Sequence, residues 1–125
     1  MKQVINSKKA PAPIGPYSQG ILTNGMLFVS GQIPTDPLTG ELLQGDIKKQ
    51  TKQVMSNLLA ILTEAGMDFL NVVKTSIFLS DLGNFNVVNE VYATYFKDNP
   101  PARECIQAAK LPRNADVEIS VIAVV

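Results

Sequence analysis

The sequence of 125 residues contains no histidine and only one cysteine. Without histidine, the chain cannot form a Ser-His or Cys-His nucleophilic pair, and it offers no imidazole to a metal ion. A single cysteine excludes an internal disulfide and a cysteine-rich zinc site. Any chemistry must therefore come from carboxylates, Arg, Lys or Tyr side chains, hydroxyl groups, one thiol and the backbone. We expect no metal site and no cofactor.

The chain also lacks net charge and long apolar runs. Eleven basic and eleven acidic residues cancel, so no overall field attracts the protein to nucleic acid or to a membrane surface. No apolar stretch reaches the ~18 residues of a membrane span, and the charged N-terminus leads into no apolar segment of a secretory signal. We expect a single cytoplasmic domain, residues 1–125, that binds neither nucleic acid nor a membrane.

Apolar periodicity indicates the secondary structure. Apolar residues three and four positions apart predict two helices, at residues 47–65 and 85–96. Short apolar or β-branched runs predict five strands, at residues 20–22, 26–30, 72–79, 102–109 and 115–124. This order predicts an α+β domain in which the helices cover one face of a mixed sheet.

The connections carry their own signals. Asn24-Gly25 lies between two apolar runs and predicts a tight hairpin. Asp46 and Gly66 flank the first helix as its expected N-terminal cap and its left-handed terminating residue. Residues 31–46 have no sustained periodicity, so they form either a functional loop or a surface loop with a small turn at 36–40.

The last strand suggests that the chain associates with itself. One of its faces is apolar throughout, with Val117, Ile119, Val121 and Ala123. The opposite face begins polar but ends with Ile122 and Val124. If both helices cover the first face, the second is too apolar to remain in water. A site formed between subunits is therefore plausible.

Arg103 begins a run that we interpret as a buried strand. A guanidinium group cannot lose its charge and is rarely buried without an anion. Strand alternation places Arg103 and Cys105 on one face. If the last two strands pair antiparallel across the short loop at 110–114, Glu118 would lie near Arg103. The two residues then form either a structural ion pair or a site in which Arg103 binds a small carboxylate through two hydrogen bonds.

Other candidate residues have ordinary explanations from pattern alone. Cys105 can be a small buried apolar residue, as intracellular thiols commonly are. Tyr17 can be an aromatic residue at the rim of a Pro/Gly-rich loop, and Asn89 can be a solvated or helix-packing amide. These alternatives stay open at the level of residue pattern.

Several motifs together resemble the Rid family of enamine/imine deaminases, also called the YjgF family. The motifs are Ala12-Pro13-Ile14-Gly15-Pro16-Tyr17-Ser18-Gln19-Gly20, Ser30-Gly31-Gln32-Ile33-Pro34, Pro101-Ala102-Arg103, Leu111-Pro112 and Val117-Glu118-Ile119. The resemblance covers essentially the whole chain. It implies a chorismate-mutase-like fold with a mixed six-stranded sheet and two helices on one face. It further implies a homotrimer whose open sheet faces pack inward, with clefts between neighbouring subunits.

The resemblance also implies residue roles and an activity. Arg103 would hold the substrate carboxylate, Glu118 would orient or activate water, and Cys105 would contribute to the water and substrate site. The cleft would be lined by Tyr17, Gly31 and Asn89. The reaction would hydrolyse 2-iminobutanoate, 2-iminopropanoate and its enamine 2-aminoacrylate to 2-oxo acids and ammonia, protecting pyridoxal-phosphate enzymes. The alternative is a non-catalytic regulatory trimer that senses small carboxylates.

Overall fold

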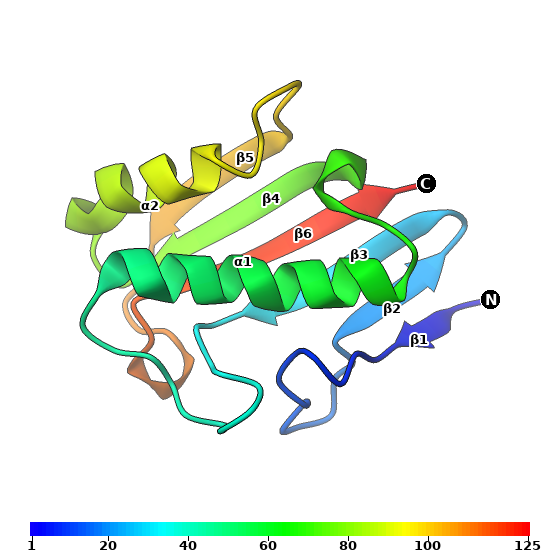
Figure 1. Cartoon of the computed structure of the whole chain (residues 1–125), viewed down its shortest axis with the longest axis horizontal. Helices are drawn as coiled ribbons and strands as arrows, with labels where there is room; N and C mark the ends of the chain where they lie inside the picture. Colours follow the sequence, from blue (N-terminus) through cyan, green and yellow to red (C-terminus); the bar gives the residue numbers. More distant parts are fainter.

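The computed structural model describes residues 1–125 and places two helices on one face of a six-stranded mixed sheet (Figure 1). The elements are β1 (Gln3–Ile5), β2 (Gly20–Thr23), β3 (Met26–Gln32), α1 (Ile47–Glu64), β4 (Val72–Leu79), α2 (Phe85–Ala93), β5 (Ala102–Gln107) and β6 (Val117–Val124). The strand order is β1-β2-β3-β6-β4-β5. Only β4 and β5 pair in parallel. The predicted α+β architecture is confirmed.

Helix α1 has the ends that the sequence predicts. The Asp46 carboxylate accepts hydrogen bonds from the backbone N–H groups of Lys48 (2.9 Å) and Lys49 (3.2 Å). Beyond the C-terminus, Gly66 takes the left-handed conformation with φ of +75°. The inward stripe of α1 is fully or almost fully buried, with Thr51, Val54, Met55, Leu58, Ile61 and Leu62. Each buried leucine or isoleucine contributes about 1.5–3 kcal/mol to folding.

Two short elements differ from the expectation. Strand β1 pairs antiparallel with β2 and was not predicted, because three residues are too few to show a period of two. Helix α2 ends at Ala93 and not at Phe96. There the backbone tightens, since Tyr95 N–H donates to the Tyr92 carbonyl and Phe96 N–H donates to the Ala93 carbonyl.

The predicted pairing of the last two strands is wrong. Strand β5 pairs in parallel with β4, and β6 lies on the other side of β4. The long alternating strand β6 takes the centre of the sheet, where it buries Val117, Ile119 and Val121. Strand β5 is left at the edge, and Arg103 is exposed. Arg103 therefore does not belong to a buried strand. The expectation that its charge is buried and must be balanced by an anion is wrong.

The segment after β3 is a surface loop with a small turn. Gly31 and Gln32 still belong to β3. The turn is closed by the Gly40 N–H, which donates to the Asp36 carbonyl at 2.8 Å. Buried Asn57 of α1 holds the loop through its side-chain donation to the carbonyls of Ile33 (3.3 Å) and Thr35 (2.9 Å). The turn at 36–40 is confirmed.

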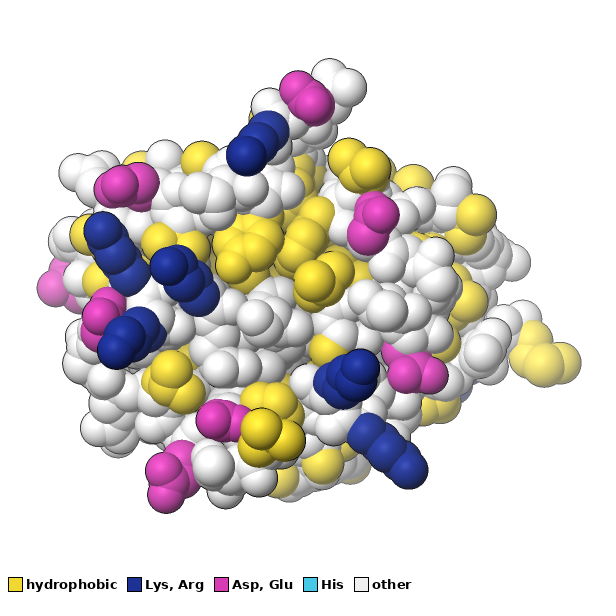
Figure 2. All heavy atoms as spheres, viewed as in Figure 1, with side chains coloured by type: hydrophobic (Ala, Val, Ile, Leu, Met, Phe, Trp, Pro, Cys, Tyr) yellow, Lys and Arg dark blue, Asp and Glu magenta, His cyan; other side chains and the backbone are white.

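The sheet face opposite the helices mixes apolar and polar side chains. We call it the open face; its apolar residues include Met26, Phe28, Phe78, Ile106, Ile122 and Val124, and its polar residues include Lys74, Ser76, Glu104, Glu118 and Ser120. Phe28 is 41% exposed and Ile106 is 50% exposed. Figure 2 shows the helix-covered side instead, where basic and acidic side chains are interspersed. Neither helix has the length and apolar character needed to cross a membrane.

Candidate functional site

Arg103 lies at the start of β5, against helix α2. Its Nη1 donates a hydrogen bond of 2.6 Å to Oδ1 of Asn89. Its guanidinium carbon lies 5.0 Å from the ring centroid of Tyr92 and 5.6 Å from that of Phe85. The only salt bridge in the chain joins Lys74 to Glu104 at 2.9 Å. The structural ion pair between Arg103 and Glu118 is therefore not formed within the chain.

A cavity of about 430 Å³ opens beside Arg103. It is lined by Asn89, Tyr92, Ala93, Phe96, Pro100, Pro101 and Arg103. The bond to Asn89 uses one of the five N–H donors of the guanidinium group. The remaining donors can meet a planar carboxylate with two parallel hydrogen bonds. This side of the sheet thus offers an anchor for a small anion.

Cys105 shares the face of Arg103, as the strand alternation predicts. It is half-buried, lies in register with Ile77 of β4 and packs against the core. Burial raises the pKa of the thiol, and the positive charge of Arg103 opposes that shift. A raised pKa keeps the thiol protonated, so Cys105 is poorly suited to act as a thiolate nucleophile.

Glu118 lies on the open face, beside Gly31. It is in register with Phe78 of β4, and the pairing of β3 with β6 is irregular between Val29 and Gln32. At this irregularity the backbone of Gly31 approaches so closely that a β-carbon there would overlap the Glu118 carboxylate. Burial raises the pKa of Glu118 above its usual value. A carboxyl group whose pKa is raised is a stronger base than an ordinary glutamate, so it can take up and return a proton more readily.

Tyr17 lies near Gly31 at the end of the Pro/Gly-rich loop. The two residues line a small cavity of about 80 Å³ together with buried Gln19 and Gln32. Gln19 fixes the loop, because its side chain donates to the Pro11 carbonyl at 2.9 Å. Tyr17 itself is 51% exposed. Gly31 therefore connects the two residues, because it lines this cavity with Tyr17 and lies beside the Glu118 carboxylate.

The six predicted residues fall into two groups that one chain does not bring together. Arg103, Cys105 and Asn89 lie on the helix side of the β5 edge, whereas Glu118 belongs to the open face. Cys105 pairs with Ile77, and Glu118 pairs with the next residue, Phe78, so the two side chains point to opposite faces. The expected convergence of Arg103 and Glu118 within one chain is wrong.

The sequence pattern does not reveal two of the neighbours of Arg103. Phe85 and Tyr92 are predicted only as apolar positions of the second helix, yet both rings lie over the guanidinium group. A signal was available, since Phe85, Asn89 and Tyr92 follow i, i+4, i+7 spacing and so share one side of α2. An amide between two aromatic residues on one helix side indicates a partly polar contact.

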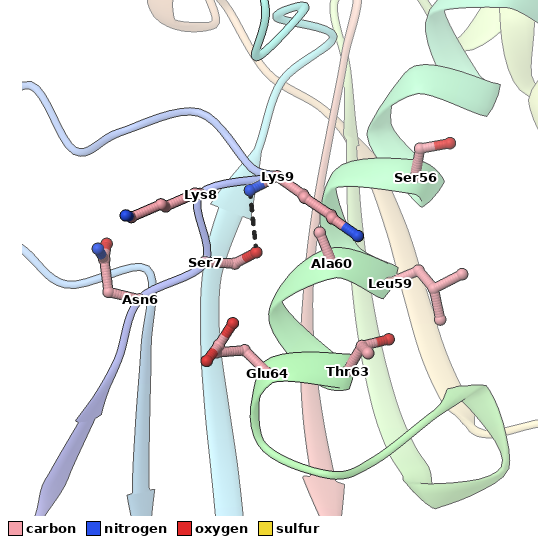
Figure 3. Close-up of a pocket in the computed structure, with 9 residues that line it drawn as sticks. All are labelled: Asn6, Ser7, Lys8, Lys9, Ser56, Leu59, Ala60, Thr63 and Glu64. Carbon is pink, nitrogen blue, oxygen red and sulfur yellow. Dashed lines mark hydrogen bonds between the residues drawn. The ribbon is translucent and has the colours of Figure 1, made fainter.

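The largest cavity, about 680 Å³, lies elsewhere (Figure 3). It separates the N-terminal segment at residues 6–9 from α1 residues including Leu59 and Glu64, and contains none of the six predicted residues. The one hydrogen bond drawn within it joins the Lys9 N–H to Ser7 Oγ at 3.1 Å. No cluster of three or more Cys, Asp or Glu residues is arranged to hold a metal ion. The candidate site is therefore placed at Arg103 and Glu118.

The raised pKa of Glu118 predicts how stability depends on pH. Because the folded chain keeps this proton to a higher pH than the unfolded chain, stability falls as the pH rises between the two pKa values. The loss of folding stability is complete above the pKa of Glu118 in the folded chain, and it is absent below the pKa of Glu118 in the unfolded chain. Glu118→Gln is therefore expected to raise the Tm at about pH 7, with the gain vanishing at about pH 3.5. Thermal unfolding followed by circular dichroism measures both values; an equal gain at both would contradict the shift.

The chain is similar to known proteins over nearly its whole length. The model of the family described as Endoribonuclease L-PSP matches residues 7–125. A human 2-iminobutanoate/2-iminopropanoate deaminase is 46% identical over 124 residues, 99% of this chain and 90% of the human protein. A Yersinia pestis structure from the Rid family, of unknown function, superposes with a TM-score of 0.96 at 50% identity over 100% of both chains. The structure of Escherichia coli TdcF with bound serine superposes with a TM-score of 0.94 at 39% sequence identity, over 98% of both chains.

Proposed function

Because the chain belongs to the endoribonuclease L-PSP family, which contains the Rid (YjgF) proteins, we propose that it hydrolyses 2-imino acids and their enamine tautomers to 2-oxo acids and ammonia. The proposal rests on Arg103, an anion anchor with no carboxylate partner in its own chain, together with Glu118, a half-buried carboxyl group of raised pKa beside Gly31. The human relative named as a deaminase for 2-iminobutanoate and 2-iminopropanoate supports the choice of substrate.

The active site would be completed by a second copy of the chain. Arg103 and Glu118 lie on opposite sides of the sheet, so one chain cannot present both to one small molecule. Association through the open face would cover its exposed apolar residues Phe28 and Ile106 and carry Glu118 into the interface. We propose a homotrimer in which Arg103 of one subunit faces Glu118 of the next. Light scattering should then give a mass of three times 13.5 kDa, about 40 kDa.

The chemistry follows from the two groups. Arg103 would bind the substrate carboxylate and fix the C=N carbon in place, which is a proximity effect. The Glu118 carboxylate would accept a proton from water as the water oxygen attacks that carbon. From the protonated imine, this attack gives a neutral carbinolamine with one new C–O bond. Glu118 would then return the proton to nitrogen. The C–N bond would break as the hydroxyl group becomes C=O and gives its proton to Glu118, and ammonia and a 2-oxo acid would leave.

This reaction requires neither a covalent intermediate nor a redox step. Imines hydrolyse in water unaided, so a site of few groups suffices. Cys105 remains protonated because burial raises its pKa, and its S–H group would donate weakly to water or substrate near Arg103. Tyr17, Gly31 and Asn89 would line the cleft. The physiological use would be removal of reactive imines and enamines that pyridoxal-phosphate dehydratases release.

The activity is tested by whether the protein removes an imine that is generated in the same solution. A threonine dehydratase generates 2-iminobutanoate, semicarbazide traps what remains, and the adduct is followed by its absorbance. The protein is expected to suppress the adduct at catalytic concentrations. No suppression at near-stoichiometric protein would rule out the deaminase function.

A non-catalytic sensor of small carboxylates is the second candidate. It would need the unpaired guanidinium of Arg103 but not a water-activating carboxyl group beside the Gly31 backbone. Binding of 2-oxobutanoate without any turnover of the imine would identify it. The raised pKa of Glu118 favours the enzyme.

The close approach of Gly31 to Glu118 gives a further prediction. Gly31→Ala would place a methyl group where the carboxylate lies. Because a displacement of about 1 Å can cost about a hundredfold in rate, we expect kcat to fall by about that factor. Gly15→Ala is the matched control, since its added β-carbon meets only the Tyr17 ring at 3.6 Å and 3.7 Å, an ordinary contact. Equal kinetics for Gly31→Ala and the control would contradict the assigned position of Glu118.

A further inference from the structure

The guanidinium group of Arg103 rests on two aromatic rings that its proposed role does not explain. We call Phe85 and Tyr92 the aromatic seat; their ring centroids lie 5.6 Å and 5.0 Å from the guanidinium carbon. Both rings come from α2, which crosses the β5 edge on the helix-covered side (Figure 1). Contacts of this length fall within the range of cation–π attraction, which strengthens as the cation loses water.

Tyr92 is itself held firmly in place. Its hydroxyl group lies 2.8 Å from Oγ1 of Thr75, which is fully buried. Thr75 is the β4 residue in register with Arg103, so the hydroxyl ties the ring to the strand beside the arginine. On its other side the ring packs against Phe96, with centroids 4.7 Å apart. Tyr92 is 5% exposed and cannot reorient without disturbing the core.

We propose that the aromatic seat is a positioning device, in which Tyr92 and Phe85 hold the Arg103 guanidinium in the orientation that binds the carboxylate of a 2-imino acid. This inference rests on the proposed function of Arg103. The rings lie over the guanidinium group and Asn89 occupies one N–H of Nη1, so the other donors have no partner in the chain, and Arg103 lines the cavity. A free arginine loses side-chain entropy when it binds, and a seated arginine has already lost much of it.

Binding of 2-oxobutanoate measures the effect apart from turnover. Tyr92→Leu is expected to weaken binding about threefold to tenfold, because the guanidinium group would then have to be ordered as the ligand binds. Tyr92→Phe keeps the ring and is expected to bind within about twofold of the unaltered protein. The control is Tyr95→Leu, which removes a ring of equal size that meets Phe69 edge to face, with centroids 5.3 Å apart, and does not lie over Arg103. It should leave the Kd unchanged.

The arginine side-chain signal supplies a spectroscopic readout. The chain has two arginines, Arg103 and Arg113, so its Nε–Hε region should hold two NMR signals. Tyr92→Leu is expected to lower the heteronuclear NOE of the Arg103 signal, because the guanidinium group becomes mobile, and to leave that of Arg113 unchanged. A ring with only a packing role would leave both NOE values unchanged.

The outcomes separate this inference from the proposed function. If Arg103→Ala leaves binding unchanged, the proposed function fails. If Arg103→Ala abolishes binding while Tyr92→Leu binds normally, the aromatic seat is overturned and the proposed function stands. If both weaken binding, Tyr92→Leu should add nothing in the Arg103→Ala background, and a full additional loss would overturn the seat. Should Tyr92→Leu not fold, Phe85→Leu removes the half-buried ring; normal binding with an unchanged Arg103 heteronuclear NOE would overturn the proposal.

Discussion

Arg103→Ala is expected to lower kcat/KM for 2-iminobutanoate by about a hundredfold to ten-thousandfold. The change removes two charge-assisted hydrogen bonds to the substrate carboxylate, each of which contributes about 1.5–3 kcal/mol. Arg103 is exposed at the sheet edge and has no salt-bridge partner in the chain, so its loss should leave folding and assembly intact. Initial rates in the semicarbazide assay, with mass and Tm measured on the same samples, test both parts.

Two controls sharpen this result. Lys110→Ala removes one positive charge from an exposed position outside the candidate site and is expected to keep full activity. Arg103→Lys keeps the charge but loses the planar fork, and it should recover only part of the activity. Unfolding of Arg103→Ala would instead assign the residue a structural role, and unchanged kinetics would remove it from the site.

Glu118→Gln is expected to lower kcat by about a hundredfold to ten-thousandfold, the usual contribution of a general base. The amide has nearly the shape of the carboxyl group but cannot accept the proton from water. Binding of 2-oxobutanoate, which depends on Arg103, should stay within about twofold of the unaltered protein. Single-turnover rates and calorimetric Kd values measure the two quantities separately.

The pH profile and a matched glutamate complete this test. Burial raises the pKa of Glu118, so activity should fall on acidification at a higher pH than an exposed glutamate would cause. Glu41→Gln alters an exposed glutamate of the surface loop and should change neither kcat nor the profile. Equal losses of binding and turnover in Glu118→Gln would contradict its role as the base.

Local pattern was sufficient to predict most of the secondary structure. Strand β4 was predicted at residues 72–79, and the hairpin turn at Asn24-Gly25 has the positive φ angles that its residue types favour. Asp46 caps α1 as expected. These features depend on neighbouring residues, so a single sequence contains the information that fixes them.

The arrangement of β5 and β6 could not be predicted in the same way. The order of β5 and β6 in the sheet depends on contacts between distant segments of the chain. The short connection at residues 108–116 indicated that these two strands pair with each other, which is wrong. The error placed Arg103 and Glu118 together in one chain, whereas they lie on opposite faces. The motifs of the family, by contrast, indicated a site between subunits, and the separation of the two residues is consistent with that proposal.

Co-expression of two inactive variants tests the proposed intersubunit site most directly. Arg103→Ala and Glu118→Gln chains, produced together with different tags, would mix at random in a trimer. Every trimer that holds both variants would then have one site in three that combines an intact Arg103 from one subunit with an intact Glu118 from its neighbour. Activity of the purified mixed trimers at about a third of the unaltered level is the predicted result. Mixed trimers as inactive as either variant alone would contradict a site shared between chains.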